Sequence, residues 1–405
     1  VQTCALPICG IICEYNPFHN GHLYHIQETR RNGATHIVVV MSGNFTQRGD
    51  VSIIDKHDRA KLAVRHGADL VIELPVLNSL SSAENFASGA VWILSSLGCV
   101  DELSFGSECG EVGKLLKALE DVEYIALFKT DEIRSIMEKG YTYPKALNSV
   151  MRGSFPESAD VISKPNNMLA IEYLRALKKF ASPIEPFTVM RIKAPHDSME
   201  SYEDFASATY IRENILLNGR DFAFSDYMPT EWAELISDAM NTGRIASLKT
   251  LERVILYKLR TSSPEEIAEV NDVGQGLENR IYSARMSSSL EELLFTIKTK
   301  RYTMARLKRI IMSLLIGIKK EDTLNMPPYA RILALNERGS EILAQSKKYS
   351  DFPFSTSMAK LSQLNPSAKR FAELEARASD IYGLAHGKIT SAEDDFRAKI
   401  MLDME

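Results

Sequence analysis

The 405-residue sequence predicts an α/β fold, in which a doubly wound parallel sheet is followed by a mostly helical C-terminal domain. Two observations lead to this prediction. In the first half, apolar runs such as IVVV at residues 37–40 alternate with longer amphipathic stretches, and such runs are typical of parallel strands that are covered on both faces. After residue 220, amphipathic stretches follow one another without apolar runs between them. The first pattern indicates βα units and the second a helical domain.

The strands of the sheet are predicted from the apolar runs in chain order. They lie at residues 8–13, 35–41, 69–74 and 101–107, with a later strand at 186–193. Helices are expected between them at residues 23–31, 55–66 and 82–97, and Asp55 is a suitable N-cap for the second of these. Ligands bind at the carboxyl ends of the strands in such a sheet. We therefore expect a site where the first strand, residues 42–44 and Gly106 meet.

The rest of the chain is predicted to be mainly helical. Helices are expected within residues 110–151, at 167–179, from 207 onward, and at 230–240, 247–259, 264–268 and 276–286. A strand and a helix are expected at 330–343, and a helical tail from 367. We place a domain boundary near residue 219, which gives domains 1–219 and 220–405. Residues 1–8 are a candidate for non-native sequence, because Pro7 stands where a strand should be forming.

Composition excludes some classes of protein. Hydrophobic residues make up 45% and charged residues 25%, as in ordinary globular proteins, and no run of about 20 apolar residues could span a membrane. A net charge of −5 argues against a general coat for nucleic acid but allows one basic face. The five cysteines are an odd number without CxxC spacing, which indicates reduced thiols and a cytoplasmic protein. They are Cys4, Cys9, Cys13, Cys99 and Cys109.

The segment GIICEYNPFHNGHLYH at residues 10–25 carries the chemistry. It joins a predicted strand to a helix start, whose unpaired N–H groups and dipole favour phosphate. Gly21 allows close approach of the backbone, and the imidazoles of His19 and His22 can donate hydrogen bonds to phosphate oxygens. A nucleoside triphosphate suits this arrangement. The alternatives are an ordinary polar cap and a metal site, but HxxH lacks the glutamate of HExxH and we predict no metal ligands.

The sequence HNGH resembles the HxGH signature of the nucleotidylyltransferase superfamily. Together with MSGNFTQRGD at 41–50 and DLVIELP at 69–75, the longer string EYNPFHNGH is similar to the bacterial tRNA(Met) cytidine acetate ligases. FGSE, KPNNMLAIEYL, RIK and SATYIR also match, so the resemblance covers most of the chain. It implies a Rossmann-like ATP domain and a reaction in which acetate and ATP form acetyl-adenylate. Acetyl transfer to N4 of the wobble cytidine of elongator tRNA(Met) would follow, giving N4-acetylcytidine.

The resemblance also implies the residues of the ATP site. His19, His22 and Arg212 are the expected catalytic residues, with Arg212 one turn into a helix whose N-terminus can hold phosphate. The residues expected around ATP are Gly10, Ile11, Ile12, Cys13, Glu14, Tyr15, Asn16, Pro17, Phe18, His19, Asn20, Gly21, His22, Leu23, Gly106, Asn167, Arg191, Ile192, Ser207 and Thr209. Asn166 is the alternative to Asn167, and Arg48 and Lys56 are candidates for pyrophosphate. Mg²⁺ is expected on the phosphates.

A basic cluster marks the segment 289–318, which is predicted to be helical. Its apolar residues recur at helical spacing, so one face can pack while the other carries positive charge. The cluster consists of Lys298, Lys300, Arg301, Arg306, Lys308 and Arg309. A solvated helix face is one interpretation, and contact with the phosphates of tRNA is the other.

Two other functions remain open from the sequence. An adenylyltransferase for a small phosphorylated acceptor would use the same motifs, although it needs no large helical domain. A non-catalytic RNA-binding protein is the second alternative. The acetate site and the base for the cytidine amine do not follow from the sequence, although His196 and Asp197 are a pair of the right type.

Overall fold

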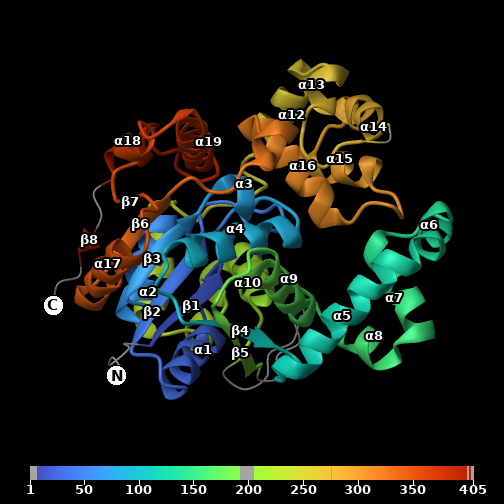
Figure 1. The fold of residues 1–405 in the computed structure, drawn as a ribbon. Helices are drawn as coiled ribbons and strands as arrows, with labels where there is room; N and C mark the ends of the chain where they lie inside the picture. The colour runs from blue at the N-terminus through green and yellow to red at the C-terminus, as the bar shows by residue number, and fades with distance from the viewer. Residues whose placement is uncertain (1–6, 192–204, 275, 399–400, 403–405) are drawn as a thin grey trace.

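The computed structural model describes residues 7–191, 205–274, 276–398 and 401–402. Its centre is an eight-stranded sheet in the order β5-β4-β1-β2-β3-β6-β7, with β8 also beside β6 (Figure 1). The five predicted strands are confirmed and are parallel to one another: β1 (Ile8–Cys13), β2 (His36–Ser42), β3 (Leu70–Leu74), β4 (Glu102–Ser107) and β5 (Glu185–Met190). This is the predicted doubly wound α/β fold.

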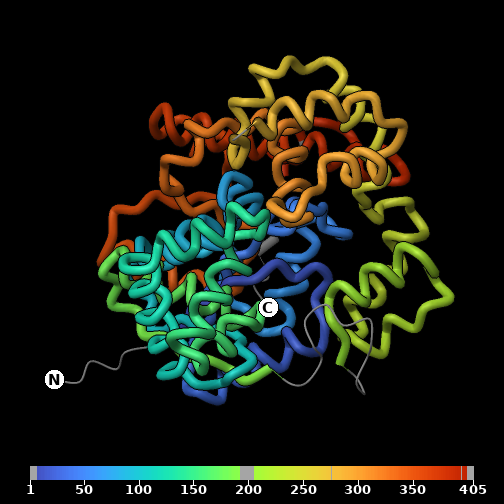
Figure 2. The backbone as a smooth tube through the Cα atoms, turned by 90° about the vertical axis from the view of Figure 1, so that its right-hand side faces the viewer, coloured from blue at the N-terminus to red at the C-terminus, as the bar shows by residue number. Residues whose placement is uncertain are grey.

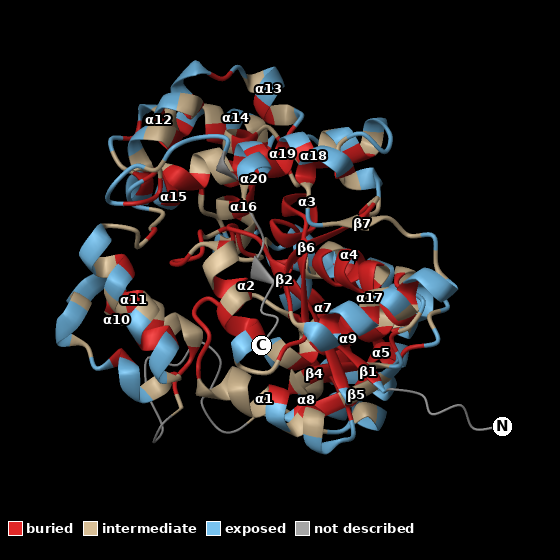
Figure 3. Cartoon of the chain, turned by 90° about the vertical axis from the view of Figure 1, so that its left-hand side faces the viewer, coloured by how far each residue is buried: buried red, intermediate tan, exposed pale blue. Residues whose placement is uncertain are grey.

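Both faces of the sheet are buried, which explains the continuous apolar runs (Figure 3). Along β1 and β2, Ile8, Ile12, Val38 and Val40 belong to the core on one face of the sheet. The apolar residues that alternate with them in the two strands belong to the core on the other face. The first core is covered by α4 (Ala83–Ser96), α5 (Val112–Phe128), α7 (Tyr143–Ser154), α8 (Pro156–Ile162) and α9 (Pro165–Lys179). The second is covered by α1 (Asn20–Arg31), α2 (Lys56–Arg65), α10 (Ala208–Asn218) and α11 (Thr230–Thr242).

The helices between β4 and β5 form a projection beside the sheet, seen in teal and green in Figure 1. It contains α5, α6 (Thr130–Glu138), α7 and α8, and α9 then returns the chain to the sheet. Asp55 caps α2 as predicted, since its side chain accepts a hydrogen bond from the His57 N–H.

A third core lies in the C-terminal half, where the yellow and orange helices stand above the sheet in Figures 1 and 2. These helices are α12 (Glu252–Thr261), α13 (Pro264–Ala268), α14 (Leu277–Ser283), α15 (Leu290–Ile297) and α16 (Met304–Ile316). They share this core with α19 (Pro366–Gly383) and with apolar side chains from the N-terminal half, among them Phe45 and Val51. The helical half therefore packs directly on loops of the sheet domain.

The C-terminal half also adds strands to the sheet. The predicted strand and helix at 330–343 are β6 (Ala330–Leu335) and α17 (Glu337–Tyr349). Strand β6 pairs antiparallel with β3, and β7 (Phe354–Ser355) and β8 (Met401–Leu402) pair parallel with β6. The boundary near residue 219 stays a prediction, but the sheet contains strands from both sides of it.

The remaining elements are short. They are α3 (Val76–Ser79), α18 (Met358–Leu361), α20 (Asp394–Arg397) and 3₁₀ helices at Gly219–Asp221, Phe224–Tyr227, Ala284–Met286 and Lys320–Leu324. Within the described ranges, no helix combines the length and apolar character needed to cross a membrane. The four cysteines that the structure describes form no disulfide.

Candidate active site

A cavity of about 380 Å³ lies at the carboxyl ends of β1, β4 and β5. Its wall combines the segment after β1, the first turns of α1, α9 and α10, and the loop after β2. The sequence predicts a site where the first strand, residues 42–44 and Gly106 meet. The cavity lies at the first strand and Gly106, whereas Gln47 and Arg48 line it in place of residues 42–44. Predicted site residues in its wall are Ile12, Cys13, Glu14, Tyr15, Asn16, His19, Gly21, His22, Arg48, Gly106, Arg191, Ser207, Thr209 and Arg212.

His19 and His22 form a reciprocal cap at the start of α1. The Gly21 N–H donates to His19 Nδ1 at 3.1 Å, and the His19 N–H donates to His22 Nδ1 at 3.2 Å. An Nδ1 that accepts a hydrogen bond carries no proton, so each ring is neutral with its proton on Nε2. The rings stack with centroids 3.8 Å apart. Local backbone geometry thus makes both histidines neutral donors.

The environment of His22 favours the same protonation state. Burial lowers the pKa of His22 well below its usual range, and the charge of Arg191 lowers it further. His25 lies one turn along the same helix, and burial followed by the charge of Arg191 lowers its pKa to about 4. Near pH 7 His22 and His25 are therefore uncharged, so His22 can polarise a phosphate oxygen only through its N–H group.

Gly21 is required by the histidine pair itself. A Cβ at this position would lie 2.9 Å from His19 Cε1 and 3.0 Å from His19 Nδ1. Any larger residue would therefore displace the ring of His19 from its cap. The sequence predicted room for a phosphate as the reason for this glycine, and the structure supplies a different one.

Two helix N-termini meet at the cavity. One belongs to α1, and the other to α10, where the Ser207 hydroxyl accepts from the Tyr210 N–H at 3.0 Å. Arg212 donates to the carbonyl of Asn16 at 2.5 Å and to Thr209 Oγ1 at 3.2 Å, so it joins α10 to the segment after β1. The dipole ends and the arginines give this side of the cavity positive potential, which suits phosphate groups.

Arg59 stabilises the strand ends that carry the site. Its guanidinium is buried and donates to the carbonyl of Glu14 at 2.6 Å, to that of Ser42 at 3.1 Å and to that of Gly43. It thereby fixes the ends of β1 and β2 relative to each other. No feature of the sequence distinguished Arg59 from an exposed helix residue, because its partners are main-chain oxygens.

Arg191 and Asn166 form the wall near Gly106. Arg191 Nη1 donates to Asn166 Oδ1 at 3.0 Å, and Asn166 Nδ2 donates to Glu108 Oε1 at 2.7 Å. A Cβ at Gly106 would lie 3.4 Å from Arg191 Cγ, so the glycine leaves room beside this arginine.

Of the two adjacent asparagines, Asn166 lines the cavity and Asn167, the one favoured from the sequence, does not. Asn167 is buried, and its Oδ1 accepts from the N–H groups of Glu108 and Cys109 at 2.8 and 3.2 Å. It therefore orders the turn after β4, whereas Asn166 lines the cavity. Adjacent residues at a helix start point in different directions, which the sequence could not resolve.

Some residues of the segment 10–25 support the site without lining the cavity. They are Gly10, Ile11, Pro17, Phe18, Asn20 and Leu23. A Cβ at Gly10 would lie 2.8 Å from Leu94 Cδ1, Phe18 stacks on Trp232 with centroids 5.2 Å apart, and Asn20 donates to the carbonyl of Asp226 at 3.2 Å. Ile192, His196 and Asp197 lie outside the described residues.

Some residues of the cavity wall were not predicted. They are Tyr24, His25, Gln47, Ala83, Phe86, Phe105, Pro165, Met168, Leu169, Tyr173, Val189, Met190, Phe205, Ala206 and Ala208. His25 follows His22 by three residues, so helical spacing could have indicated it. Its Nε2 lies 2.9 Å from Ser104 Oγ, which lies 2.7 Å from Thr29 Oγ1. Most of the others are apolar, like core residues in any helix or strand.

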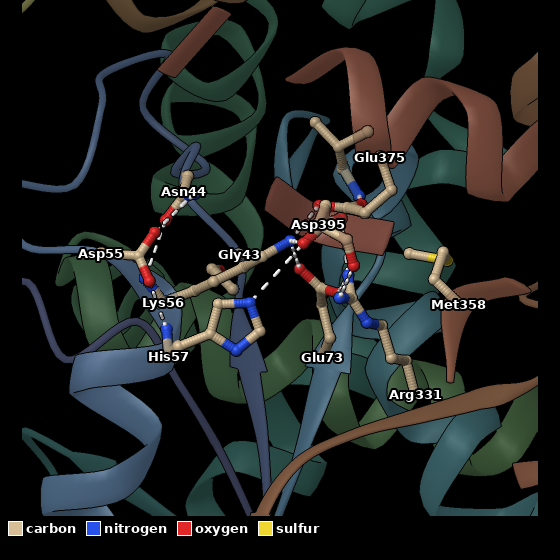
Figure 4. A network of polar contacts seen from close by, with 12 residues as sticks. Gly43, Asn44, Asp55, Lys56, His57, Glu73, Arg331, Met358, Glu375 and Asp395 are labelled. Carbon is tan, nitrogen blue, oxygen red and sulfur yellow. Dashed lines mark hydrogen bonds and ion pairs between the residues drawn. The ribbon is translucent and has the colours of Figure 1, made fainter. Parts of the chain in front are cut away.

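Lys56 is not a pyrophosphate ligand, which corrects that prediction. It is 1% exposed and lies outside the cavity, with Nζ 2.6 Å from Glu73 Oε1 and 2.9 Å from Asp395 Oδ1 (Figure 4). Arg331 Nη1 lies on the other side of the same carboxylates, 2.8 Å from Glu73 and 2.7 Å from Asp395. The cluster joins β3 to β6 and the C-terminal segment.

Glu375 completes this buried cluster. Its Oε2 accepts from the Val76 N–H at 2.7 Å, and its Oε1 lies 3.4 Å from Lys56 Nζ. Burial and the neighbouring Glu73 raise the pKa of Glu375 to about 8. At neutral pH the protonated Glu375 leaves two cations facing two carboxylates, so the charges balance.

The basic cluster does not form one exposed helix face, which corrects the sequence interpretation. Helix α15 ends at Ile297 and α16 begins at Met304. Lys300 and Arg301 are exposed in the loop between them, and Lys298 donates to the carbonyl of Thr299 at 3.0 Å. Arg306 donates to the carbonyl of Asp272 at 2.7 Å, and Lys308 and Arg309 contact the loop after β2.

The described ranges contain no group of three or more His, Cys, Asp or Glu side chains that could hold a metal ion. The described wall is instead rich in hydrogen-bond donors, namely the imidazole N–H groups, the arginines and the helix N-termini. Such a wall suits a polyanion more than a cation.

The sheet with its histidine-capped helix at the cavity defines a HIGH nucleotidyl transferase, and the model of that family matches residues 6–396. A tRNA(Met) cytidine acetate ligase of Thermoanaerobacter sp. (strain X514) is 39% identical over 398 residues, which cover 96% of this chain and 98% of the relative. The enzyme of the same name from Acetivibrio thermocellus is 38% identical over 400 residues, covering 94% of this chain and 95% of the relative. The chain belongs to the tRNA(Met) cytidine acetate ligase family.

Solved structures agree with this assignment. Thermotoga maritima TmcAL bound with alpha-thio ATP (Form II) is 29% identical and superposes with a TM-score of 0.87, covering 98% of this chain and 99% of that one. The apo form I of the same protein is 30% identical with a TM-score of 0.89, over the same shares of the two chains. The relationship extends over the sheet and the helical half together.

Proposed function

We propose that this chain is an ATP-dependent ligase that activates acetate and acetylates N4 of the wobble cytidine of elongator tRNA(Met). The observation that carries the proposal is the cavity in which two neutral imidazoles, Arg212 and two helix N-termini converge. ATP is the proposed cofactor, and the names of the relatives and the ATP analogue in the Thermotoga maritima structure support it.

In the first step an acetate oxygen attacks the α-phosphorus of ATP. The bond from that phosphorus to the oxygen of the leaving pyrophosphate breaks, and acetyl-adenylate forms. Negative charge increases on the phosphate oxygens during the transfer, and donors aimed at those oxygens lower the barrier. His19 and His22 supply N–H donors from Nε2, and Arg212 supplies a guanidinium.

In the second step the cytidine N4 attacks the acetyl carbon. AMP leaves as the C–O bond of the mixed anhydride breaks, and N4 loses a proton as the amide forms. Both steps require positioning and charge stabilisation rather than a covalent nucleophile on the protein. The adenosine end of ATP fits the side of the cavity formed by Gly106, Asn166 and Arg191.

Mg²⁺ accompanies ATP in this proposal and is held mainly by phosphate oxygens and water. The donor-rich wall of the described residues favours this arrangement over a site built from protein carboxylates. The ion would neutralise charge on the pyrophosphate as it leaves.

The tRNA is proposed to approach the helical half. Lys300 and Arg301 are its first candidate contacts, because both are exposed in the loop between α15 and α16. Such contacts are sequence-independent and sensitive to salt. A tRNA substrate also implies that the enzyme works in the cytoplasm.

Exchange of radiolabelled pyrophosphate into ATP tests the activation step. We expect exchange that depends on acetate. Exchange in the absence of acetate would instead favour an adenylyltransferase for another acceptor. A lack of exchange with and without acetate and tRNA, in a chain that binds tRNA, would favour a non-catalytic RNA-binding protein.

A further inference from the structure

The loop at residues 43–51 lies between the cavity and helix α16. On one side Gln47 and Arg48 line the cavity, and the Gln47 N–H donates to Glu14 Oε1 at 2.7 Å. On the other side Phe45 and Val51 belong to the core of the helical half. The loop is therefore a direct physical link between the candidate ATP site and the C-terminal helices.

Two basic residues of α16 hold this loop. Lys308 Nζ lies 2.9 Å from Asp50 Oδ2, and Arg309 Nη1 donates to the carbonyl of Gln47 at 3.2 Å. Arg309 is only 8% exposed, and its Nη2 lies 3.4 Å from Asp272 Oδ2. A cation that is buried in this way and bonded to a loop carbonyl is not available to a nucleic acid phosphate.

Gly49 shows how closely the loop and α16 approach. Its φ is +78°, and a Cβ there would lie 2.5 Å from the backbone nitrogen of Arg309 and 2.6 Å from Lys308 Cβ. The glycine serves both the left-handed backbone conformation and the contact with the helix. Because the apolar face of α16 is buried in the third core, the helix restricts where the loop can lie.

Arg48 is the residue that this loop presents to the positive end of the cavity. Burial raises the pKa of the Glu14 carboxyl and lowers the pKa of the Arg212 guanidinium, and the nearby positive charge of Arg48 has a smaller, lowering effect on both. Arg48 therefore acts at the same end of the cavity as Arg212. A small displacement of the loop would move this charge relative to bound phosphates.

We propose that Lys308 and Arg309 are positioning residues of the ATP site, which hold Gln47 and Arg48 in the cavity wall, and that they do not contact tRNA. The proposal rests on the proposed function, since it assumes that the cavity binds ATP. It reassigns two members of the basic cluster from RNA recognition to the nucleotide site. Lys300 and Arg301 remain the candidates for RNA.

A charge exchange across the Lys308–Asp50 pair tests the proposal. The variants are Lys308→Asp, Asp50→Lys and the two together, in the full chain, with Lys249→Asp as an exposed control in the same half. Calorimetric titration with ATP and Mg²⁺ gives the dissociation constant, and filter binding gives the affinity for tRNA. Thermal unfolding verifies that each variant is folded.

We expect each single change to weaken ATP binding about tenfold, because like charges then face each other at the loop. The double variant should recover most of this loss, and the tRNA affinity of all three should stay close to that of the unaltered chain. Arg309→Ala should weaken ATP binding in the same way, with partial rescue by Arg309→Lys. Lys249→Asp should change neither affinity.

Unchanged ATP affinity in the single variants, or a double variant no better than the singles, would overturn the proposal. Loss of tRNA affinity without loss of ATP affinity would also overturn it and return Lys308 to the RNA surface. If a single variant does not fold, the ATP affinities of the double variant and of Arg309→Lys still test the positioning role. If the unaltered chain binds no ATP, the proposed function fails, whereas ATP binding that is insensitive to these changes contradicts the positioning role alone.

Discussion

His19 and His22 each accept a backbone N–H at Nδ1 while their rings stack 3.8 Å apart. The same two hydrogen bonds that cap α1 therefore also fix the tautomer of the rings. A carboxylate or hydroxyl side chain could cap the helix, but it would not offer an N–H to phosphate. The motif thus combines a helix cap with a pair of neutral donors.

Replacement of His22 by alanine tests the donor role. We expect acetate-dependent exchange of pyrophosphate to fall by about 10²–10³-fold, as for the loss of one donor to a developing charge. The affinity for tRNA should change little, because His22 lines the cavity, whereas Lys300 and Arg301, the candidate tRNA contacts, do not. Equal losses in exchange and tRNA affinity would instead assign His22 a structural role.

Gly21→Ala tests whether the glycine serves the histidine pair. The added Cβ would lie 2.9 Å from the His19 ring, so we expect the ring to move and exchange to fall by about tenfold or more. Gly153→Ala is the matched control in a helix, because a Cβ at Gly153 would have no neighbouring atom within 4 Å in the part of the chain that the structure describes. The control should retain full exchange. Normal exchange in Gly21→Ala would show that the observed ring position is not needed.

These residues also show what the sequence could and could not reveal. The histidine cap and Ser207 of α10 were predictable because helix starts and their caps are local patterns. Lys308 and Lys56 were not, because their partners Asp50, Glu73 and Asp395 are distant in sequence. A basic side chain looks the same in a sequence whether it faces solvent or a buried carboxylate.

The pairing of β6 with β3 has a similar origin. The apolar run at 330–335 predicts a strand, but its place in the sheet depends on contacts across more than half of the chain. The apolar wall of the cavity, including Phe86 and Met168, could not be predicted either. Helical spacing shows which face of a helix is buried, but not whether that face lines a cavity or packs in a core.

The raised pKa of Glu375 predicts a dependence of stability on pH. Between its ordinary value of 4.5 and its folded value of about 8, the folded chain holds a proton that the unfolded chain releases. The contribution of this group to the free energy of unfolding therefore falls as the pH rises through that window. Glu375→Gln mimics the protonated form, so we expect it to be more stable relative to the unaltered chain at pH 9 than at pH 5.

Denaturant unfolding at the two pH values measures this difference. The expected change in relative stability is on the order of a few kcal/mol. Lys56→Ala provides the contrast, because it leaves Glu73 and Asp395 with one cation fewer and should destabilise the chain by about 3–5 kcal/mol at neutral pH. A pH-independent difference for Glu375→Gln would mean that Glu375 is ionised throughout.

The exposed basic residues predict a specific effect of salt. Lys300→Ala combined with Arg301→Ala should weaken tRNA binding and reduce the slope of log K against log salt by about 2, because each of the two cations would neutralise one phosphate. The dissociation constant for ATP should not change. Unaltered tRNA binding in this double variant would show that another surface of the chain holds the RNA.

We propose above that this chain transfers an acetyl group from acetate to one cytidine of tRNA. The most direct measurement is the incorporation of radiolabelled acetate into an elongator tRNA(Met) transcript in the presence of ATP and Mg²⁺. A matched transcript has uridine at the wobble position. We predict label in the cytidine transcript alone and in an ATP-dependent reaction. Equal label in both transcripts, or none in either while acetate-dependent exchange proceeds, would contradict the claim.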